Sequence, residues 1–282
     1  MMLVAVIGAT GIVGRHVVPR LREHGHHVRA IVRSEADVEV LRRVGIEAVR
    51  GDILDSHSLR QAVEGCSVAF HLATAAPRPG QAPNWALNDR IRREGTANLL
   101  EACRGARVQR YVQQSLAFLV GGSSDIVDEA APLLPATRVT ASAIDAERLV
   151  AASGLDWVIL RDGALYGPGT GREEHWRAAA RSGELQFPGA GSDYISLIHV
   201  ADLAECFTLS AERGPSGSIV SVVDDQPATY RELFAYIAPL EGAAVPTGGG
   251  VSNFPSFRVA NSKAREIFGW QPFYRSYRSG LT

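Results

Sequence analysis

The chain has 282 residues, 46% of them hydrophobic and 21% charged, and its 29 lysines and arginines nearly balance 30 acidic residues. This is the composition of a globular protein long enough to fold without disulfide or metal support, and it has no basic excess that would indicate nucleic-acid binding. The three cysteines, Cys66, Cys103 and Cys206, are odd in number and far apart, which argues against a disulfide or zinc framework and fits a cytoplasmic protein.

Short apolar runs alternate with helix-like segments over the first 161 residues. The run at 3–7 predicts a first strand rather than a signal peptide, because no basic segment precedes it, and no apolar run is long enough to span a membrane. The other predicted strands are residues 28–32, 47–50, 68–72, 110–114 and 157–161. The predicted helices are residues 12–23, 38–44, 56–64, 90–104 and 136–153. This alternation predicts an α/β fold of the Rossmann type, a doubly wound parallel sheet covered on both faces.

The regular alternation of strands and helices ends after residue 163, where glycine and proline cluster. Further helices are predicted at 173–181, 201–212, 230–239 and 262–268, and the glycine-rich segment 242–255 is a candidate mobile lid. We therefore expect residues 1–163 to form a dinucleotide-binding domain and residues 164–282 to form a smaller α/β substrate lobe, interleaved with the first. His24, His26 and His27 flank a helix end, and we expect them to be solvated rather than to bind a metal.

A glycine-rich loop lies between the first strand and the first helix. It contains Gly8, Thr10, Gly11, Ile12, Val13 and Gly14. Glycines allow a tight turn and the close approach of a pyrophosphate, and the free N–H groups of the following helix point toward that anion. The motif is weak alone but stands in the strand–loop–helix context that it requires. It predicts a dinucleotide site, with a tight turn that binds no ligand as the alternative.

The end of the second strand indicates which dinucleotide is bound. A carboxylate there would bind the ribose hydroxyls of NAD, whereas this sequence has Arg33, which can pair with the 2′-phosphate of NADP. We therefore expect NADP(H), with NAD(H) less favoured; a solvated Arg33 is the alternative. Asp52 follows the third strand beside Ile53, where its carboxylate can meet the adenine amino group or cap the next turn.

Several motifs together resemble the extended or atypical short-chain dehydrogenase/reductase superfamily, the NAD-dependent epimerase/dehydratase-like group. Besides the glycine loop, they are residues 70–73, 94–102, 165–169, 198–204, 260–263 and 269–272. The resemblance covers almost the whole chain. It implies a Rossmann fold, an oxidoreductase or epimerase-like activity on a small molecule, and cofactor contacts at Ile53 and Ala73. It also allows a homodimer formed through the helices at Arg90 and Ala136.

The catalytic residues of that superfamily have no counterparts here. The superfamily uses a Tyr-x-x-x-Lys pair on the helix after the fifth strand, with a serine or threonine at the end of that strand, and the lysine lowers the pKa of the tyrosine. The resemblance places Val139 in the tyrosine position, Ala143 in the lysine position and Leu116 in the serine position. Lys263, the only lysine, is far away in the sequence. Ser115, one residue before Leu116, remains the candidate catalytic contact.

Other residues are candidates for a displaced proton donor or for substrate contacts. They are Arg138, Thr140, Tyr166 and Tyr194, whereas His199 favours a packing role and Asp202 a helix cap. Arg92 replaces an asparagine of the superfamily. Ile195 replaces an arginine with which nucleotide-sugar members grip a diphosphate, so we expect a non-nucleotide small-molecule substrate.

Three functions are compatible with these residues. The first is an NADP(H)-dependent reductase, dehydrogenase or epimerase-like enzyme with altered acid–base groups. The second is a non-redox cyclase, dehydratase or isomerase of a secondary-metabolite pathway, which the missing tyrosine and lysine motivate. The third is a catalytically silent NADP(H)-sensing protein. All three predict a small-molecule pocket, and none predicts a nucleic-acid or membrane partner.

Overall fold

The computed structural model describes residues 1–76, 82–252 and 254–281. Its centre is a parallel sheet of seven strands in the order β11-β6-β5-β4-β1-β2-β3, which confirms the predicted fold class. The strands are β1 (Leu3–Ile7), β2 (His27–Val32), β3 (Glu47–Arg50), β4 (Val68–His71), β5 (Arg110–Leu116), β6 (Asp156–Asp162) and β11 (Ser218–Val222). The strand order reverses between β1 and β4, and ligands of doubly wound folds bind beyond the carboxyl ends of the strands at such a point.

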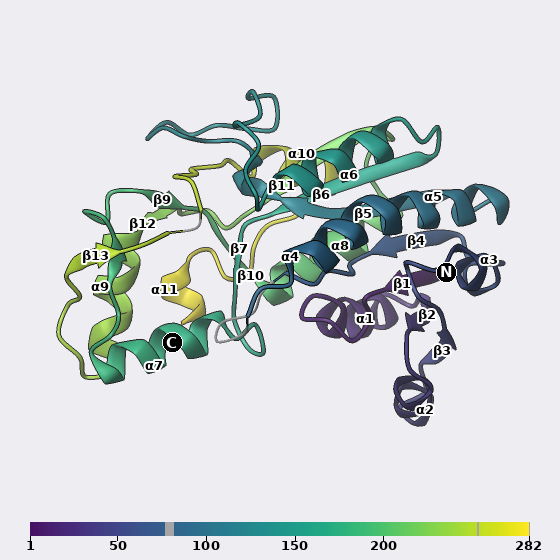
Figure 1. Cartoon of the computed structure of the whole chain (residues 1–282), viewed down its shortest axis with the longest axis horizontal. Coiled ribbons are helices and arrows are strands. Elements are labelled where there is room, and N and C mark those ends of the chain that lie inside the picture. Colours follow the sequence, from purple (N-terminus) through teal and green to yellow (C-terminus); the bar gives the residue numbers. More distant parts are fainter. Residues whose placement is uncertain (77–81, 253, 282) are drawn as a thin grey trace.

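Helices cover both faces of the sheet (Figure 1). One face carries α1 (Gly14–Glu23), α8 (Val200–Glu212) and α10 (Ser262–Phe268), and the other carries α3 (Ser56–Ala62), α5 (Thr96–Gly105) and α6 (Ala141–Ala151). The remaining elements of this half are α2 (Glu35–Arg43) beside β3, α4 (Trp85–Arg90), a π-helical turn (Ile91–Gly95) that joins α4 to α5, and a 3₁₀ turn (Ala117–Leu119) directly after β5.

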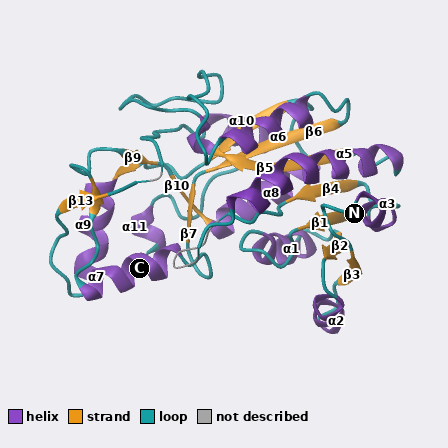
Figure 2. Ribbon diagram, viewed as in Figure 1, coloured by secondary structure: helices purple, strands orange, loops and turns teal. Residues whose placement is uncertain are grey.

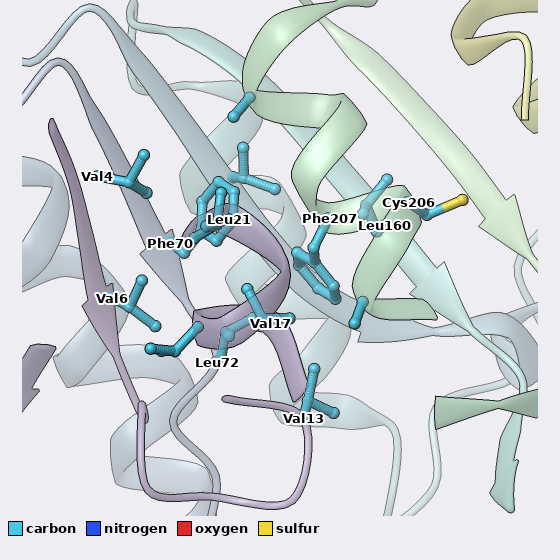
Figure 3. Close-up of a cluster of buried hydrophobic side chains, with 14 of the residues drawn as sticks. Val4, Val6, Val13, Val17, Leu21, Phe70, Leu72, Leu160, Cys206 and Phe207 are labelled. Carbon is cyan, nitrogen blue, oxygen red and sulfur yellow. The ribbon is translucent and has the colours of Figure 1, made fainter. Parts of the chain in front are cut away.

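The side chains of β1 alternate between two buried faces. Val4 and Val6 belong to the cluster drawn in Figure 3, where they lie with side chains of α1 and α8, while Ala5 and Ile7 belong to the cluster on the α3 and α5 side. Each buried aliphatic side chain contributes roughly 1.5–3 kcal/mol to stability. This packing fixes β1 and α1, and therefore the glycine loop between them.

Segments after β6 build a smaller lobe, which lies to the left of the sheet in Figure 2. Its strand pairs are β7 (Ala164–Tyr166) with β10 (Leu197–His199), β8 (Phe187–Pro188) with β13 (Gly248–Gly250), and β9 (Tyr194–Ile195) with β12 (Ala228–Thr229). Its helices are α7 (Arg172–Ser182), α9 (Tyr230–Leu240) and α11 (Tyr277–Gly280). These elements share an apolar core of their own. None of the described helices has both the length and the apolarity needed to cross a bilayer.

The seventh strand, β11, is an addition to the six strands that the sequence predicted. It comes from the second half of the chain and pairs with β6, and α8 and α10 pack on the same sheet. The apolar run around Val220 and Val222 carries the strand signal, which Ser218 and Ser221 interrupt. The division into domains after residue 163 stays a prediction.

Several predicted helices begin at the wrong residue, and two of them differ most. The helix predicted at 136–153 starts only at Ala141, because the Thr140 hydroxyl accepts the Thr137 N–H and holds a turn before it. The helix predicted at 90–104 is preceded by α4, which Asn84 caps by accepting the Leu87 N–H. The candidate lid at 242–255 includes the strand β13, so it is not wholly irregular; its residue 253 lies outside the described residues.

Candidate functional site

The loop between β1 and α1 has a shape that only glycine permits at two of its positions. Gly8 has a φ of +90°, and a Cβ atom there would lie 2.6 Å from the backbone carbon of Leu72 at the end of β4. A Cβ atom on Gly14 would lie 2.2 Å from the Gly8 carbonyl oxygen. The Gly11 N–H closes the turn by donating to that same oxygen at 2.9 Å. The loop is therefore tight and its backbone is exposed to a close approach.

The start of α1 leaves backbone donors without partners. Within the described residues, the N–H groups of Ile12 and Val13 donate to no protein acceptor, and no side chain caps the helix at Val13. Thr10 is exposed beside them. Free N–H groups and the positive end of a helix dipole favour an anion. These residues fit the pyrophosphate of a dinucleotide, and their contact with it stays a prediction.

A pocket of about 550 Å³ lies beyond the ends of β2 and β3, and Arg33, Arg50 and Asp52 are among its lining residues. In the described part of the chain, neither arginine side chain forms a hydrogen bond or an ion pair. The Asp52 carboxylate, in contrast, accepts the Leu54 N–H at 2.9 Å, so it does cap the turn that follows β3. The two guanidinium groups are therefore the charges of this pocket that lack a partner, and an anion such as a phosphate fits them.

Two more predicted cofactor contacts are Ile53 and Ala73. Ile53 is buried, its carbonyl accepts the Asn98 side-chain amide at 3.0 Å, and its side chain packs closely against Gly95. Ala73 follows Leu72 and lies close to Gly8, because a Cβ atom on Gly8 would come within 2.7 Å of the Ala73 nitrogen. The cofactor contacts of both residues stay predictions.

The positions of the missing acid–base residues have apolar surroundings. Leu116 ends β5 and packs with Leu119, Ala143 and Ile144 in one small cluster. Val139 is half-buried in the turn before α6, and its carbonyl accepts a hydrogen bond from Arg92 at 3.0 Å. The side chains in the serine, tyrosine and lysine positions therefore have no group that could exchange a proton.

Ser115, one residue before Leu116, is tied to α6. Its hydroxyl donates to the Glu147 carboxylate at 2.6 Å, and Arg161 of β6 donates to both oxygens of that carboxylate, at 2.9 and 2.7 Å. All three side chains are buried. The arrangement accounts for Ser115 as part of a buried ion pair between β5, α6 and β6. A catalytic contact of Ser115 stays a prediction.

A buried carboxyl group lies beside the serine position. Asp162 ends β6 in register with Leu116; its Oδ2 accepts the Gln114 amide at 3.2 Å, and its Oδ1 has no partner within the described residues. Burial raises the pKa of Asp162 to about 7, while Gln114 and the nearby Arg92 oppose that shift. Sequence reasoning missed this residue, although an acidic residue at the carboxyl end of an apolar strand is a detectable signal.

Arg92 and His71 add to the polarity of this region. Burial lowers the pKa of Arg92, which is half-buried and not simply exposed on its helix. His71 ends β4, and burial, with a smaller effect of Arg92, lowers its pKa to about 4, so it is neutral at physiological pH. A titratable carboxyl group and a permanent cation thus lie near the carboxyl ends of β4, β5 and β6.

The other candidate residues have structural contacts. His199 has the packing role predicted for it, because it caps α8 by accepting the Ala201 N–H and packs edge-on against the buried Tyr166. The prediction that Asp202 caps a helix is wrong, since its carboxylate accepts the N–H groups of Phe273 and Tyr274. Burial raises the pKa of the Tyr166 phenol.

Further candidates lie on the surface or in ion pairs. Arg138 binds Asp89, and Arg258 stacks on the ring of Tyr194. His26 is buried and bonded to Glu212, so the prediction that it is solvated is wrong. No group of potential metal ligands is found among the described side chains.

Comparisons with known proteins agree with this geometry. A family model described as NAD(P)H-binding matches residues 8–205. A 3-diazoavenalumate denitrifying reductase of Streptomyces sp is 35% identical, with 99% of each chain covered. A farnesyl dihydroquinoline-oxide ketoreductase of Stigmatella aurantiaca is 29% identical over 92% of this chain and 78% of the relative. The structure of MoeE5 in complex with UDP-glucuronic acid and NAD has a TM-score of 0.81 and 26% identity, and covers 99% of this chain and 96% of its own.

Proposed function

The chain belongs to the NAD(P)H-binding family of extended short-chain dehydrogenases/reductases, and we propose that it reduces a substrate whose product needs no proton from the protein. NADPH, when bound, supplies a hydride. The glycine loop 8–14 would hold its pyrophosphate, and Arg33 with Arg50 its 2′-phosphate. The observation that carries the proposal is the apolar character of all three acid–base positions, Leu116, Val139 and Ala143.

Reduction of a ketone needs two groups from the enzyme site, a hydride for the carbon and a proton for the oxygen. The proton comes most efficiently from a side chain whose pKa lies near the working pH. None of the side chains in the three acid–base positions has such a proton. The phenol of Tyr166 is buried against His199 and has a raised pKa, which makes it a poor replacement.

An aryl diazonium group accepts a hydride without this requirement. The hydride adds to the terminal nitrogen to give an aryl diazene, which loses N₂ and leaves its hydrogen on the ring carbon. The balance is one diazonium ion and one hydride to one arene and one N₂, with no net proton. The name of the 35% identical relative, a denitrifying reductase of a diazo compound, supports this class of substrate. We therefore propose reductive removal of a diazo group from an aromatic acid.

The preference for NADPH over NADH rests on the pocket beyond β2 and β3. Arg33 and Arg50 line it without a protein partner in the described residues, and a guanidinium binds a phosphate through two parallel hydrogen bonds. Asp52 is engaged with Leu54 and is not at the end of β2, where NAD-binding proteins place a carboxylate.

The test is a reduction assay with a traceable hydrogen. The diazonium derivative of 3-amino-4-hydroxycinnamic acid is incubated with the protein and with NADPH carrying deuterium at the reactive carbon. We expect stoichiometric NADPH oxidation that the deuterium slows, N₂ release, and 4-hydroxycinnamate as the product, at a rate well above that without protein. Turnover without NADPH consumption would instead indicate a non-redox enzyme, and NADPH binding without turnover would refute the proposal.

A second candidate function is ketone reduction with Asp162 as the proton donor. The unpartnered Oδ1 and the pKa of about 7 favour it, as does the 29% identical ketoreductase. In that case a β-ketoester would be reduced at a rate that falls as the pH rises through about 7, and Asp162→Asn would abolish the reaction. Reduction of the diazonium probe would survive the same substitution.

A further inference from the structure

The smaller lobe contains a cation that has no ion-pair partner among the described residues. Arg172 begins α7, and its guanidinium carbon lies 5.8 Å from the centre of the Trp176 ring and 5.4 Å from that of the Phe254 ring. Within the described residues its side chain donates to no carboxylate, carbonyl or hydroxyl. The next two arginines of α7, Arg177 and Arg181, both pair with Glu241. Arg172 therefore differs from its neighbours on the same helix.

In the described structure, no carboxylate compensates the charge of Arg172. Burial lowers the pKa of Arg172, and the phenol of Tyr230, which itself shares a hydrogen bond with Ser252, opposes that shift. The side chain is only half-buried, so part of it stays accessible. A desolvated cation gains most from an anion that brings its own hydrogen-bond acceptors.

Aromatic rings connect Arg172 with the end of β5. The ring of Phe254 packs edge-on against Phe118, with centroids 4.9 Å apart, and Phe118 stands two residues after Leu116. The contacts of Arg172 with Phe254 and of Phe254 with Phe118 thus lead from the arginine to the turn after β5. A rigid conjugated molecule suits an arginine flanked by rings, because its faces can stack on the rings while its charged end reaches the guanidinium.

We infer that Arg172 binds the carboxylate of a flat aryl acid, with the Phe254 and Trp176 rings flanking the anchored end. The reacting end of that acid then lies toward Leu116 and Asp162. The inference rests on the proposed function for the aromatic acid and for the end that reacts, whereas the anchoring of a carboxylate at Arg172 can be tested without any turnover. This assigns a substrate class, a conjugated aromatic carboxylate, to the smaller lobe.

Calorimetric titration with 4-hydroxycinnamate and with its methyl ester, both in saturating NADP⁺, tests the anchor. The two ligands share their shape, but only the acid carries a charge. Because a hydrogen-bonded charge pair is worth more than a neutral contact, we expect the wild type to prefer the acid by roughly 10- to 100-fold. Arg172→Gln should remove that preference while leaving ester binding in place, and Arg172→Lys should retain part of it.

Arg231→Gln is the matched control, because Arg231 also stacks on a ring of this lobe, 4.6 Å from the centre of Phe187, but donates to the Ala190 carbonyl. It should keep the preference for the acid. Thermal unfolding of each variant shows whether the fold is intact. The inference would be overturned if wild type and Arg172→Gln had the same ratio of affinities for the acid and its ester. It would also be overturned if the wild type bound benzoate, phenylacetate and 4-hydroxycinnamate no more tightly than their methyl esters. Since no hydride is transferred, these outcomes are independent of the reduction assay.

Discussion

The buried ion pair of Glu147 and Arg161 holds the Ser115 hydroxyl at the end of β5, and its contribution to stability can be measured. The Glu147 side chain is 7% exposed and that of Arg161 3%, and two hydrogen bonds join them while Ser115 donates a third. Replacing Glu147 by leucine leaves the Arg161 cation buried without its partner. Removing one member of such a pair costs about 3–5 kcal/mol, because the remaining charge is desolvated and uncompensated.

Two further variants separate the parts of this network. Ser115→Ala removes one hydrogen bond to a charged acceptor and should cost about 1.5–3 kcal/mol. The double variant Glu147→Leu/Arg161→Met should be more stable than Glu147→Leu alone, since an apolar pair leaves no buried charge without a partner. The urea midpoints, followed by circular dichroism, should therefore decrease from wild type to Ser115→Ala to Glu147→Leu.

The same proteins decide whether Ser115 takes part in catalysis. If its hydroxyl serves only the ion pair, Ser115→Ala loses stability but keeps most of its NADPH oxidation rate at a temperature where it is folded. An alanine variant as stable as the wild type but about 100-fold slower would refute this reasoning, because that is the scale of a lost acid–base contact. The urea midpoint and the NADPH oxidation rate of Ser115→Ala together distinguish a structural serine from a catalytic one.

Three other outcomes follow from the geometry. Gly8→Ala should lose NADPH affinity in a fluorescence titration, because its Cβ would collide with Leu72, whereas Gly25→Ala, which also has a positive φ but open space around it, should keep that affinity and lose only stability. Arg33→Asp should weaken NADPH binding by roughly 10- to 100-fold and favour NADH, while Arg43→Asp on α2 should change neither; equal losses for both cofactors would count against a 2′-phosphate site. Burial raises the pKa of Asp162 to about 7, so the folded state retains a proton that the unfolded chain releases near pH ~4, and stability should fall between those two values as the pH rises. Asp162→Asn should lack that fall in its urea midpoints.

The cofactor half of the site could be predicted because its causes are local in the sequence. Gly8 and Gly14 are required by close approaches within one strand–loop–helix unit, and Arg33 stands where β2 ends. Apolar runs with short periods predict such strands directly. The same local reasoning missed β11, because Ser218 and Ser221 interrupt its apolar pattern and only the pairing with β6 reveals it.

The rest of the site depends on contacts between distant segments. Ser115 is tied to Glu147, which lies 32 residues later, so its buried position has no signal in the residues around it. The proposed role of Arg172 depends on its contact with Phe254, a residue of another loop, and on its side chain forming no ion pair in the described structure. The end of β6 shows the same limit, because the pKa of Asp162 follows from burial that only the packed sheet produces.

The two ends of the candidate site make complementary demands on a substrate. Arg172 offers a positive charge that forms no ion pair in the described structure, and Asp162 offers a carboxyl group that ionises near neutral pH. A molecule with a carboxylate at one end and a cationic, hydride-accepting nitrogen group at the other matches these two groups. Such a reaction does not require the tyrosine and lysine of the superfamily, because it consumes a hydride and no net proton.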